Sequence, residues 1–249
     1  MGTNCLLLSF RNGVRKILFN RPEKRNAFNG EMYKTLTNTL NDDAQNDKIV
    51  VTILTGAGAY YSSGTDLNPT AANGSLEDYM KLVQAFIDYP KLLIAVVNGP
   101  AIGIAATTAV LCDIIYASDT AHFETPFLRL GLCAEGASSY TFPRTLGRSR
   151  ASEILFLSKK MSAKEACDVG LISRVIPHNQ LDSFIDGLYE YGSLPLNAVK
   201  INKKLIMHEL KGILTRANIR EFESLETCIG SEEFVNALMS FMQKKKSKL

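Results

Sequence analysis

The sequence lacks the cysteine and histidine patterns that mark several classes of protein. Its five cysteines are scattered and include no Cys-x-x-Cys pair, which favours a reducing compartment over a disulfide framework. The three histidines, His122, His178 and His208, do not have the spacing of metal ligands, so we predict no metal site. The chain also has no internal repeat, no low-complexity tract and no linker between independent domains.

Signals for membranes and nucleic acids are equally scarce. No apolar run is long enough to span a bilayer, no signal peptide is recognisable, and Leu6 stands where myristoylation requires Ser or Thr. The net charge of +3 is too small to indicate nucleic acid, although a few clustered basic residues can hold an anionic cofactor. We therefore expect no membrane span and no nucleic-acid partner.

What is present is typical of a globular protein with an ample core, since 46% of the residues are hydrophobic and 21% are charged. Apolar and turn residues predict a strand-rich half with interspersed helices, followed by a helical tail. Asn-Gly predicts a hairpin of Leu6–Phe10 and Val14–Phe19, and Asn29 is a good N-cap for a helix through about Leu40. Residues 123–144 are turn-rich. Further strands are expected over 49–55, 113–117 and 171–175, and further helices over 76–89, 148–157 and 163–169.

Two loops of small residues follow predicted buried strands. Ile94–Val97 runs into the turn Asn98-Gly99-Pro100, after which an apolar segment has the length of a helix. Gly103 would let another backbone or a ligand approach the start of that helix, whose free N–H groups can hold a developing oxyanion. A closely packed turn is the alternative. The strand at 49–55 runs into Gly56–Leu67, so the two loops could present two N–H groups to one carbonyl oxygen.

Two polar features accompany these loops. Residues 20–28 carry three basic side chains close together, which would form either a solvated turn or a loop that contacts phosphate. Glu135 lies among apolar and small residues, which is unusual for a carboxylate. From the residues alone, Glu135 is either an exposed loop residue or a functional acid.

These motifs together resemble the crotonase superfamily, the enoyl-CoA hydratase/isomerase family, over essentially the whole chain. The matching segments are Asn20-Arg21-Pro22 with Asn26-Ala27, Ser62-Ser63-Gly64-Thr65-Asp66-Leu67, Ala95–Gly103 and Cys112–Ala117. Each segment alone is modest support for the resemblance, whereas all four in this order and at these separations are specific to the family. The most similar subgroup is the peroxisomal Δ3,Δ2-enoyl-CoA isomerases, through Tyr60–Gly64, Glu135–Pro143 and the last three residues.

The resemblance implies an α/β fold, a crotonase-like spiral of β-β-α repeats with a C-terminal helical trimerisation region. The spiral core would cover residues 1–192 and the helical region 193–249, and the protein would be a homotrimer or a hexamer. The apolar residues of the tail fit an interface, although the tail could instead fold back on its own core. They are Leu205, Ile206, Leu210, Leu214, Phe222, Leu225, Ile229, Phe234, Leu238 and Phe241.

The resemblance also implies a binding site for an acyl-CoA thioester. The backbone N–H groups of Thr65 and Ile104 would form the oxyanion hole. Lys24, Arg25 and Ala27 would lie against the nucleotide of CoA. Because CoA is part of the substrate, no separate cofactor is expected. The other implied binding residues are Ser63, Gly64, Asp66, Leu67 and Gly103.

Departures from the hydratase pattern point to the reaction. Hydratases of the family use two glutamates, and alignment puts Thr107 and Phe127 at those positions, with Glu124 three residues from the second. The peroxisomal isomerases carry their single base where Glu135 stands. The resemblance therefore implies isomerisation of cis or trans 3-enoyl-CoA to 2-trans-enoyl-CoA in β-oxidation of unsaturated fatty acids. A hydratase or a non-catalytic acyl-CoA-binding protein of the same fold is the alternative.

The sequence ends in Ser247-Lys248-Leu249, which matches the tripeptide that the peroxisomal import receptor recognises. The expected location is therefore the peroxisomal matrix, and the import receptor is an expected partner.

Overall fold

The computed structural model describes residues 4–68 and 74–246, and its centre is a six-stranded sheet. The first two strands form an antiparallel hairpin, and the other strands are parallel. Asn12 and Gly13 both have positive φ (48° and 75°), which is the requirement of the tight hairpin turn that Asn-Gly predicts. In sheet order the strands are β1 (Leu6–Arg11), β2 (Val14–Phe19), β3 (Val51–Gly56), β4 (Leu92–Val97), β6 (Ile114–Ser118) and β9 (Arg174–Ile176).

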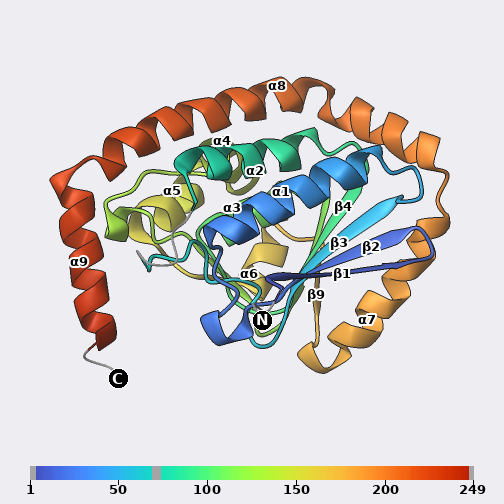
Figure 1. Cartoon of the computed structure of the whole chain (residues 1–249), viewed down its shortest axis with the longest axis horizontal. Helices are drawn as coiled ribbons and strands as arrows, with labels where there is room; N and C mark the ends of the chain where they lie inside the picture. Colours follow the sequence, from blue (N-terminus) through green and yellow to red (C-terminus); the bar gives the residue numbers. More distant parts are fainter. Residues whose placement is uncertain (1–3, 69–73, 247–249) are drawn as a thin grey trace.

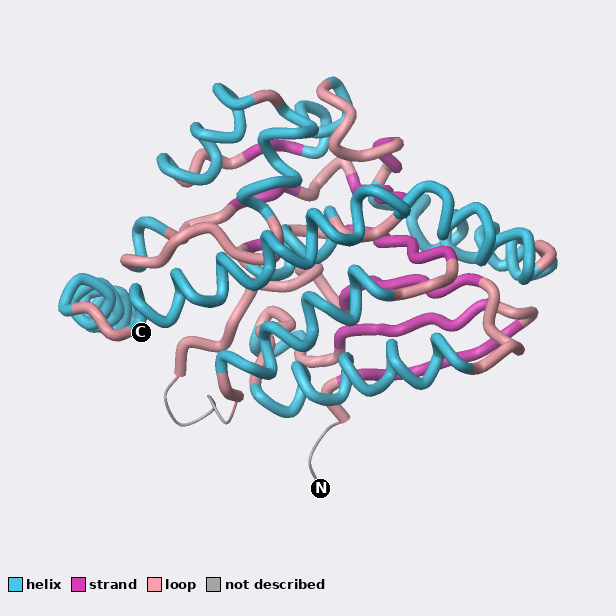
Figure 2. The backbone as a smooth tube through the Cα atoms, turned by 90° about the horizontal axis from the view of Figure 1, so that it is seen from above, coloured by secondary structure: helices cyan, strands magenta, loops and turns pink. Residues whose placement is uncertain are grey.

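Helices cover both faces of the central strands of this sheet, whereas the edge strand β1 is mostly exposed. On one face lie α1 (Gly30–Gln45) and α2 (Leu76–Asp88), and α8 (Leu196–Ile229) arches over them across nearly the whole width of the molecule (Figures 1 and 2). On the other face, α7 (Leu181–Gly187) packs against apolar side chains of β2, β3 and β4. Parallel strands that are buried on both faces are near-continuously apolar, as the sequence of β3 and β4 is.

A smaller three-stranded sheet holds the segments that follow β4. Its strands are β5 (Ala101–Ile102), β7 (His122–Glu124) and β8 (Met161–Ser162). The helices around it are α3 (Ile104–Val110), α4 (Ser138–Leu146), α5 (Arg148–Leu157) and α6 (Ala163–Asp168). Short 3-10 turns and α9 (Glu232–Lys246) complete the described elements. No helix in the described ranges combines the length and apolarity needed to cross a bilayer.

The structure adds short elements to this region that the sequence does not predict. The turn-rich segment 123–144 overlaps β7 and α4 at its two ends, and the short strand β5 lies between the central turn and its helix. α4 holds Pro143 and several Ser and Thr residues, which have poor intrinsic helix propensity. β5 is only two residues long, and its partners come from distant parts of the chain. Contacts far apart in sequence therefore decide both elements.

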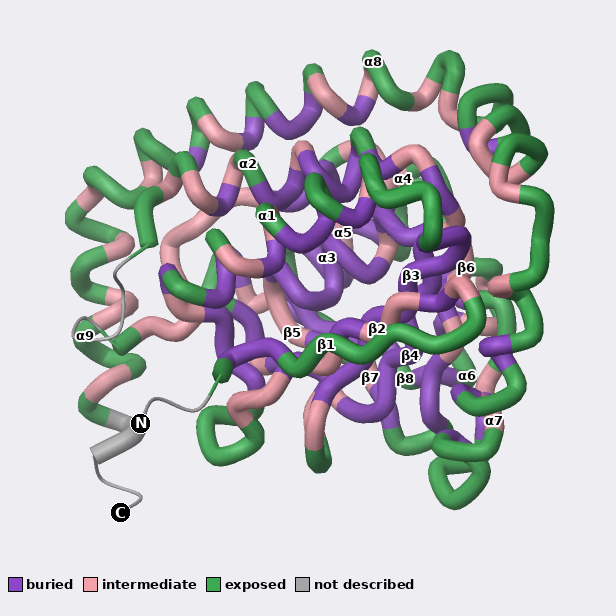
Figure 3. The backbone as a smooth tube through the Cα atoms, turned by 45° about the vertical axis from the view of Figure 1, so that its right-hand side comes forward, coloured by how far each residue is buried: buried purple, intermediate pink, exposed green. Residues whose placement is uncertain are grey.

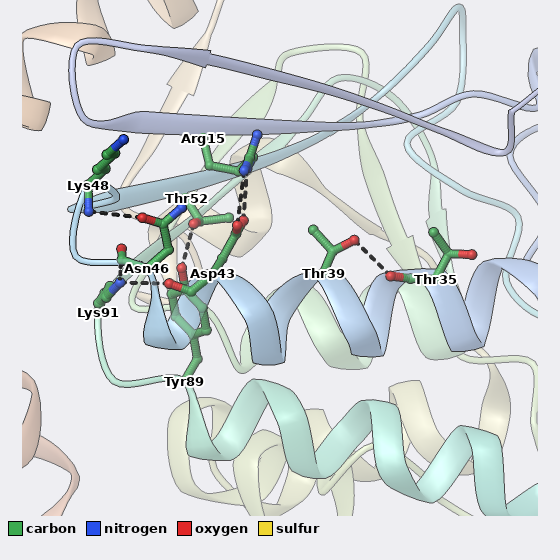
Figure 4. Close-up of polar contacts among 9 residues, drawn as sticks. All are labelled: Arg15, Thr35, Thr39, Asp43, Asn46, Lys48, Thr52, Tyr89 and Lys91. Carbon is green, nitrogen blue, oxygen red and sulfur yellow. Dashed lines mark hydrogen bonds and ion pairs between the residues drawn. The ribbon is translucent and has the colours of Figure 1, made fainter.

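The helix α1 begins as predicted and ends later than predicted. The Met32 N–H donates to the Asn29 side chain at 2.9 Å, so Asn29 is the N-cap. The helix continues to Gln45 rather than Leu40. At this end, the fully buried Lys91 ammonium donates to the carbonyl oxygens of Asp43 (2.6 Å) and Asn46 (2.7 Å) (Figure 4). A cation at a helix C-terminus satisfies its free carbonyls.

Polar contacts fix α8 along α2 and bring its C-terminal end to the rest of the core. The Lys211 ammonium pairs with Asp88 at 2.8 Å, and the Asn218 side chain donates to the Met80 carbonyl at 3.2 Å. Leu214 and Leu225 are buried in the main core cluster. Along α8 in Figure 3, exposed residues lie on the outer side of the turns, and intermediate or buried residues lie on the side toward the core. The predicted α/β fold with a helical C-terminal region is therefore confirmed.

Candidate active site

The two small-residue loops meet where β3 and β4 end. The Ser62 N–H donates to the Pro100 carbonyl at 3.2 Å, and the Ile102 N–H donates to the Ser62 carbonyl at 3.0 Å. Gly64 has a φ of +84°, and a Cβ atom there would lie 2.7 Å from the Ile102 carbonyl oxygen. The same Cβ atom would lie 3.7 Å from the Cα of Gly103. Only glycine allows this approach, and it brings two backbones that follow neighbouring parallel strands into contact.

Two N–H groups at this junction are available to a ligand. Thr65 follows Gly64, and Ile104 is the first residue of α3. Within the described part of the chain, neither main-chain N–H donates to a protein acceptor. Gly103, with φ +57° and ψ −128°, directs its own N–H to the Glu124 carbonyl at 2.8 Å. The N–H of Ile104 is thereby left as the first free donor of the helix.

Glu135 reaches this junction from a third segment. Only 8% of Glu135 is exposed, and a Cβ atom on Gly103 would lie 3.9 Å from its Oε1. The next residue, Gly136 (φ +69°), lies so close to α3 that a Cβ atom there would lie 2.1 Å from the Thr107 Oγ1. The segment that carries Glu135 is therefore packed directly on the central helix.

Glu135 lies in the wall of a cavity of about 180 Å³. The polar part of the wall comes from α1, α2 and the Gly56–Leu67 loop, and the apolar part includes residues of α8 and α9. The lining residues are Phe28, Asn29, Gly30, Tyr33, Thr65, Asp66, Leu67, Gly74, Ser75, Leu76, Tyr79, Leu132, Glu135, Leu225, Ile229 and Phe234.

Burial dominates the electrostatics of this cavity. It raises the pKa of Glu135 from 4.5 to about 8, and the nearby Glu221 carboxylate adds to the rise. Burial and the Glu135 charge likewise raise the pKa of Tyr33, whose hydroxyl lies 2.8 Å from the Thr65 Oγ1. A carboxyl with a pKa near neutrality can both accept and return a proton.

The cavity gathers four of the residues predicted from the sequence: Thr65, Asp66, Leu67 and Glu135. The Asp66 carboxylate is paired with Arg21 at 3.1 Å, which ties its loop to the basic loop. Gly64, Gly103 and Ile104 adjoin the cavity without being among the described residues of its wall.

The basic loop lies beside the loop after β3. The Ser63 N–H donates to the Arg25 carbonyl at 2.9 Å, and the buried Asn26 side chain donates to the carbonyls of Ala57 and Tyr60. Ala27 is buried, whereas Lys24 and Arg25 are exposed at the surface. Two cationic side chains therefore stand next to the site and remain open to a solvent-borne anion. Ser247-Lys248-Leu249 lies outside the described residues.

The structure buries both residues that the resemblance aligns with the hydratase glutamates. Thr107 is buried against Gly136, and Phe127 is buried with its ring beside Gly103. Glu124 does not line the cavity, and its carboxylate pairs instead with Arg129 (3.5 Å) and Lys160 (3.8 Å).

The sequence prediction did not include several residues of the wall. Tyr33 and Tyr79 come from α1 and α2, and their hydroxyls contact Thr65 and the Gly136 N–H. The sequence predicts Leu225, Ile229 and Phe234 only as apolar residues of the tail. Leu225 and Ile229 are four residues apart and share a face of α8, but this spacing does not say which surface the face meets, and Phe234 lies on α9.

The fold and this site define a protein class. The model of the enoyl-CoA hydratase/isomerase family matches residues 9–249, and the chain belongs to this family, the crotonases. Enoyl-CoA delta isomerase 2 of Rattus norvegicus is 43% identical over 96% of this chain, which spans 64% of that relative's length. Enoyl-CoA delta isomerase 3, peroxisomal, of Mus musculus is 39% identical over 98% of this chain and 80% of its own length. The crystal structure of an enoyl-CoA hydratase/isomerase from Pseudoalteromonas atlantica is 30% identical, with a TM-score of 0.91 over 97% of this chain and 98% of that one.

Proposed function

We propose that the chain is an enoyl-CoA isomerase that converts cis or trans 3-enoyl-CoA to 2-trans-enoyl-CoA, with Glu135 as its single acid–base group. The observation that carries the proposal is the position of the buried Glu135 carboxylate beside Gly103, next to the free N–H of Ile104. The names of the rat and mouse relatives support the same reaction.

The chemistry needs few groups. Moving the double bond requires loss of a proton from C2 and gain of a proton at C4. The C2 proton becomes acidic only when the thioester oxygen is stabilised as it gains charge, and the N–H groups of Thr65 and Ile104 would supply that stabilisation. Glu135 would take the proton from C2 and return it to C4. Lys24 and Arg25 would attract the phosphates of CoA to the mouth of the site.

Hydration of a 2-enoyl-CoA is the runner-up reaction, and the site disfavours it. A hydratase of this family would hold a water molecule between two acids. Here Thr107 and Phe127 occupy those positions, and Glu124 is engaged with Arg129 and Lys160. The substitutions leave Glu135 as the acid beside the two free N–H groups.

A side-by-side assay tests the proposal. Purified protein is given 3-enoyl-CoA and 2-enoyl-CoA, and isomerisation and hydration are measured separately. We expect isomerisation to dominate and to fall by about 10²–10⁴ in Glu135→Gln, while acyl-CoA binding is retained. Glu124→Gln is the matched control and should keep wild-type turnover. Dominant hydration would favour a hydratase, and binding without any turnover would favour a non-catalytic member.

An isotope experiment tests the shuttle itself. Substrate deuterated at C2 should transfer some deuterium to C4, because a shielded carboxylic acid can return its proton before it exchanges with water. Normal turnover by Glu135→Gln would assign the base to another residue.

We also propose that the protein assembles as a trimer or hexamer and works in the peroxisome, as a β-oxidation enzyme. Leu205 and Ile206 on the outer face of α8 are 70% and 67% exposed, and burial between copies would cover them. Light scattering at micromolar concentration should report a trimer or larger, and a monomer would contradict the assembly. The name of the mouse relative supports the location. A fluorescent protein fused before Met1 should give punctate signal that Lys248→Glu abolishes.

A further inference from the structure

Glu221 is a buried carboxylate that the reaction does not use directly. It lies on α8 with only 5% of its surface exposed. Its Oε2 accepts the Ala137 N–H at 2.6 Å, and its Oε1 accepts the Ser139 N–H at 2.8 Å. It forms no ion pair with any described residue. A buried carboxylate without an ion pair is uncommon, because burial disfavours the ionised form.

The groups that Glu221 holds belong to the turn that carries Glu135. Ala137 has a φ of +58°, a left-handed conformation that is unfavourable for a residue with a Cβ atom. The Ser138 N–H donates to the Glu135 carbonyl at 3.2 Å, which closes the turn. The Gly136 N–H donates to the Tyr79 hydroxyl. The main chain after Glu135 is therefore held from outside by α2 and α8.

We propose that Glu221 is a positioning residue, which fixes the Glu135 turn from α8 and places a second buried carboxylate next to that turn. This inference rests on the proposed role of Glu135 as the base. It links the C-terminal helical region to the chemistry, because the helix that packs along α2 also supplies the two acceptors that hold the turn.

Few titratable groups face the Glu135 carboxylate. Glu135 faces Tyr33 from α1, Tyr79 from α2 and Glu221 from α8. No described residue of the cavity wall is a Lys or an Arg. Burial raises the pKa of Cys133 on the same loop, and the charge of Glu221 adds to that rise. Glu221 is thus the one described carboxylate whose negative charge adds to burial in raising the pKa of Glu135.

Two forces act on the charge of Glu221. Burial raises its pKa, whereas hydrogen bonds from the Ser139 side chain and from the N–H groups of Ser139 and Ala137, together with the charge of Arg220, oppose that rise. The positive end of the α4 dipole also favours a negative charge at this place. The turn that Glu221 holds in place therefore limits the rise of its pKa.

Three substitutions separate the positioning role from a purely structural one. Glu221→Gln removes the charge, Glu221→Asp keeps the charge but withdraws it from the turn, and Glu223→Gln is the control at an exposed site on the same helix. The readouts are kcat, the acid limb of the kcat/KM pH profile, and the titration of the Glu135 carboxyl by infrared spectroscopy. The band that is lost in Glu135→Gln identifies that carboxyl.

In Glu221→Gln, the acid limb and the Glu135 titration should both move to lower pH by about half a unit or more, because a nearby negative charge is gone. In Glu221→Asp, kcat should fall about tenfold or more, because a small displacement of a catalytic group is costly. The acid limb should stay within about half a pH unit of the wild type, because the charge is kept. Glu223→Gln should match the wild type in every readout. A folded Glu221→Gln with an unchanged Glu135 titration overturns the proposal.

Two safeguards keep the test decisive. If Glu221→Gln does not fold, Glu221→Asp decides, and wild-type kcat in that variant overturns the proposal. If the wild type itself does not isomerise 3-enoyl-CoA, the proposed function fails, while the infrared titration of wild type and Glu221→Gln still decides the role of Glu221.

Discussion

The carboxylate of Glu135 lies against Gly103, the residue after which α3 begins. A Cβ atom on Gly103 would lie 3.9 Å from the Glu135 Oε1 and equally far from the Phe127 ring. Glycine at this position therefore leaves room for a substrate atom between the helix start and the carboxylate. Under the proposed mechanism, the thioester oxygen would lie on the N–H side of this space and C2 on the carboxylate side.

Gly64→Ala should damage the oxyanion hole more than the fold. The added Cβ atom would lie 2.7 Å from the Ile102 carbonyl oxygen, so the Thr65 N–H must move away from Ile104. Loss of one such donor lowers kcat by about 10²–10³. Gly170→Ala is the matched control, since Gly170 has a similar φ of +75° with nothing within 4 Å. Gly64→Ala should lose more thermal stability than the control, because it adds a backbone clash to the strain of a positive φ. Equal kcat in the two variants, measured where both are folded, would contradict the prediction.

Local sequence signals predicted much of the fold. Asn12-Gly13 specified the hairpin, Asn29 capped α1, and α5 has the predicted bounds Arg148–Leu157. These signals act within a few residues, so they can be read without the tertiary structure. The turn-rich segment 123–144 gave no local signal for α4. That helix begins after the left-handed Ala137, whose N–H donates to the Glu221 side chain 84 residues away.

The candidate site, like the fold, could be predicted from the sequence only in part. The small-residue loops and Glu135 could be recognised because glycine and a carboxylate among apolar residues are unusual in themselves. Tyr33, Tyr79 and Glu221 could not, because a polar residue on a helix has the same local pattern whether it faces solvent or a cavity. The resemblance to a family named the proposed reacting groups and said nothing of the residues that hold them.

Glu135→Gln should stabilise the protein increasingly as the pH rises. The folded protein keeps a proton on Glu135 up to a pKa of about 8, whereas the unfolded chain releases it near 4.5. Stability from this group therefore falls as the pH rises through that range, by about 1.4 kcal/mol for each unit of pKa shift. Glutamine does not titrate, so the Tm difference between variant and wild type should be small at pH 4 and grow to pH 8.5.

Scanning calorimetry across this pH range checks the prediction. Glu223→Gln removes an exposed carboxylate and should follow the wild type at every pH. A Tm difference that does not vary with pH would mean that Glu135 titrates normally in the folded protein.

The apolar end of the cavity should set acyl-chain preference. Ile229 of α8 and Phe234 of α9 line it, and α9 packs so closely that a Cβ atom on Gly131 would lie 2.9 Å from the Phe234 Cα. Phe234→Ala should raise kcat/KM for longer acyl chains relative to shorter ones by about tenfold, the scale of one or two methylenes in an apolar pocket. Phe241→Ala, at an exposed site on the same helix, should leave the preference unchanged. The measurement is kcat/KM over 3-enoyl-CoA substrates of rising chain length.

Lys91→Met should destabilise the fold and leave the chemistry intact. Lys91 is fully buried, and its ammonium donates to the carbonyls of Asp43 and Asn46 at the end of α1. Methionine fills similar space but leaves both carbonyls without this donor, which should cost about 2–4 kcal/mol. In a chain of this length that loss corresponds to a Tm decrease of roughly 4–16 °C. Lys91 directly precedes β4, whereas the loop that ends at Gly103 follows that strand, so kcat at a temperature where the variant is folded should match the wild type.

Lys81→Met, which removes only an exposed pair with Glu77, should shift Tm by about 1–2 °C at most. A Tm equal to that of the Lys81 control would show that water or a local shift satisfies the α1 carbonyls without Lys91.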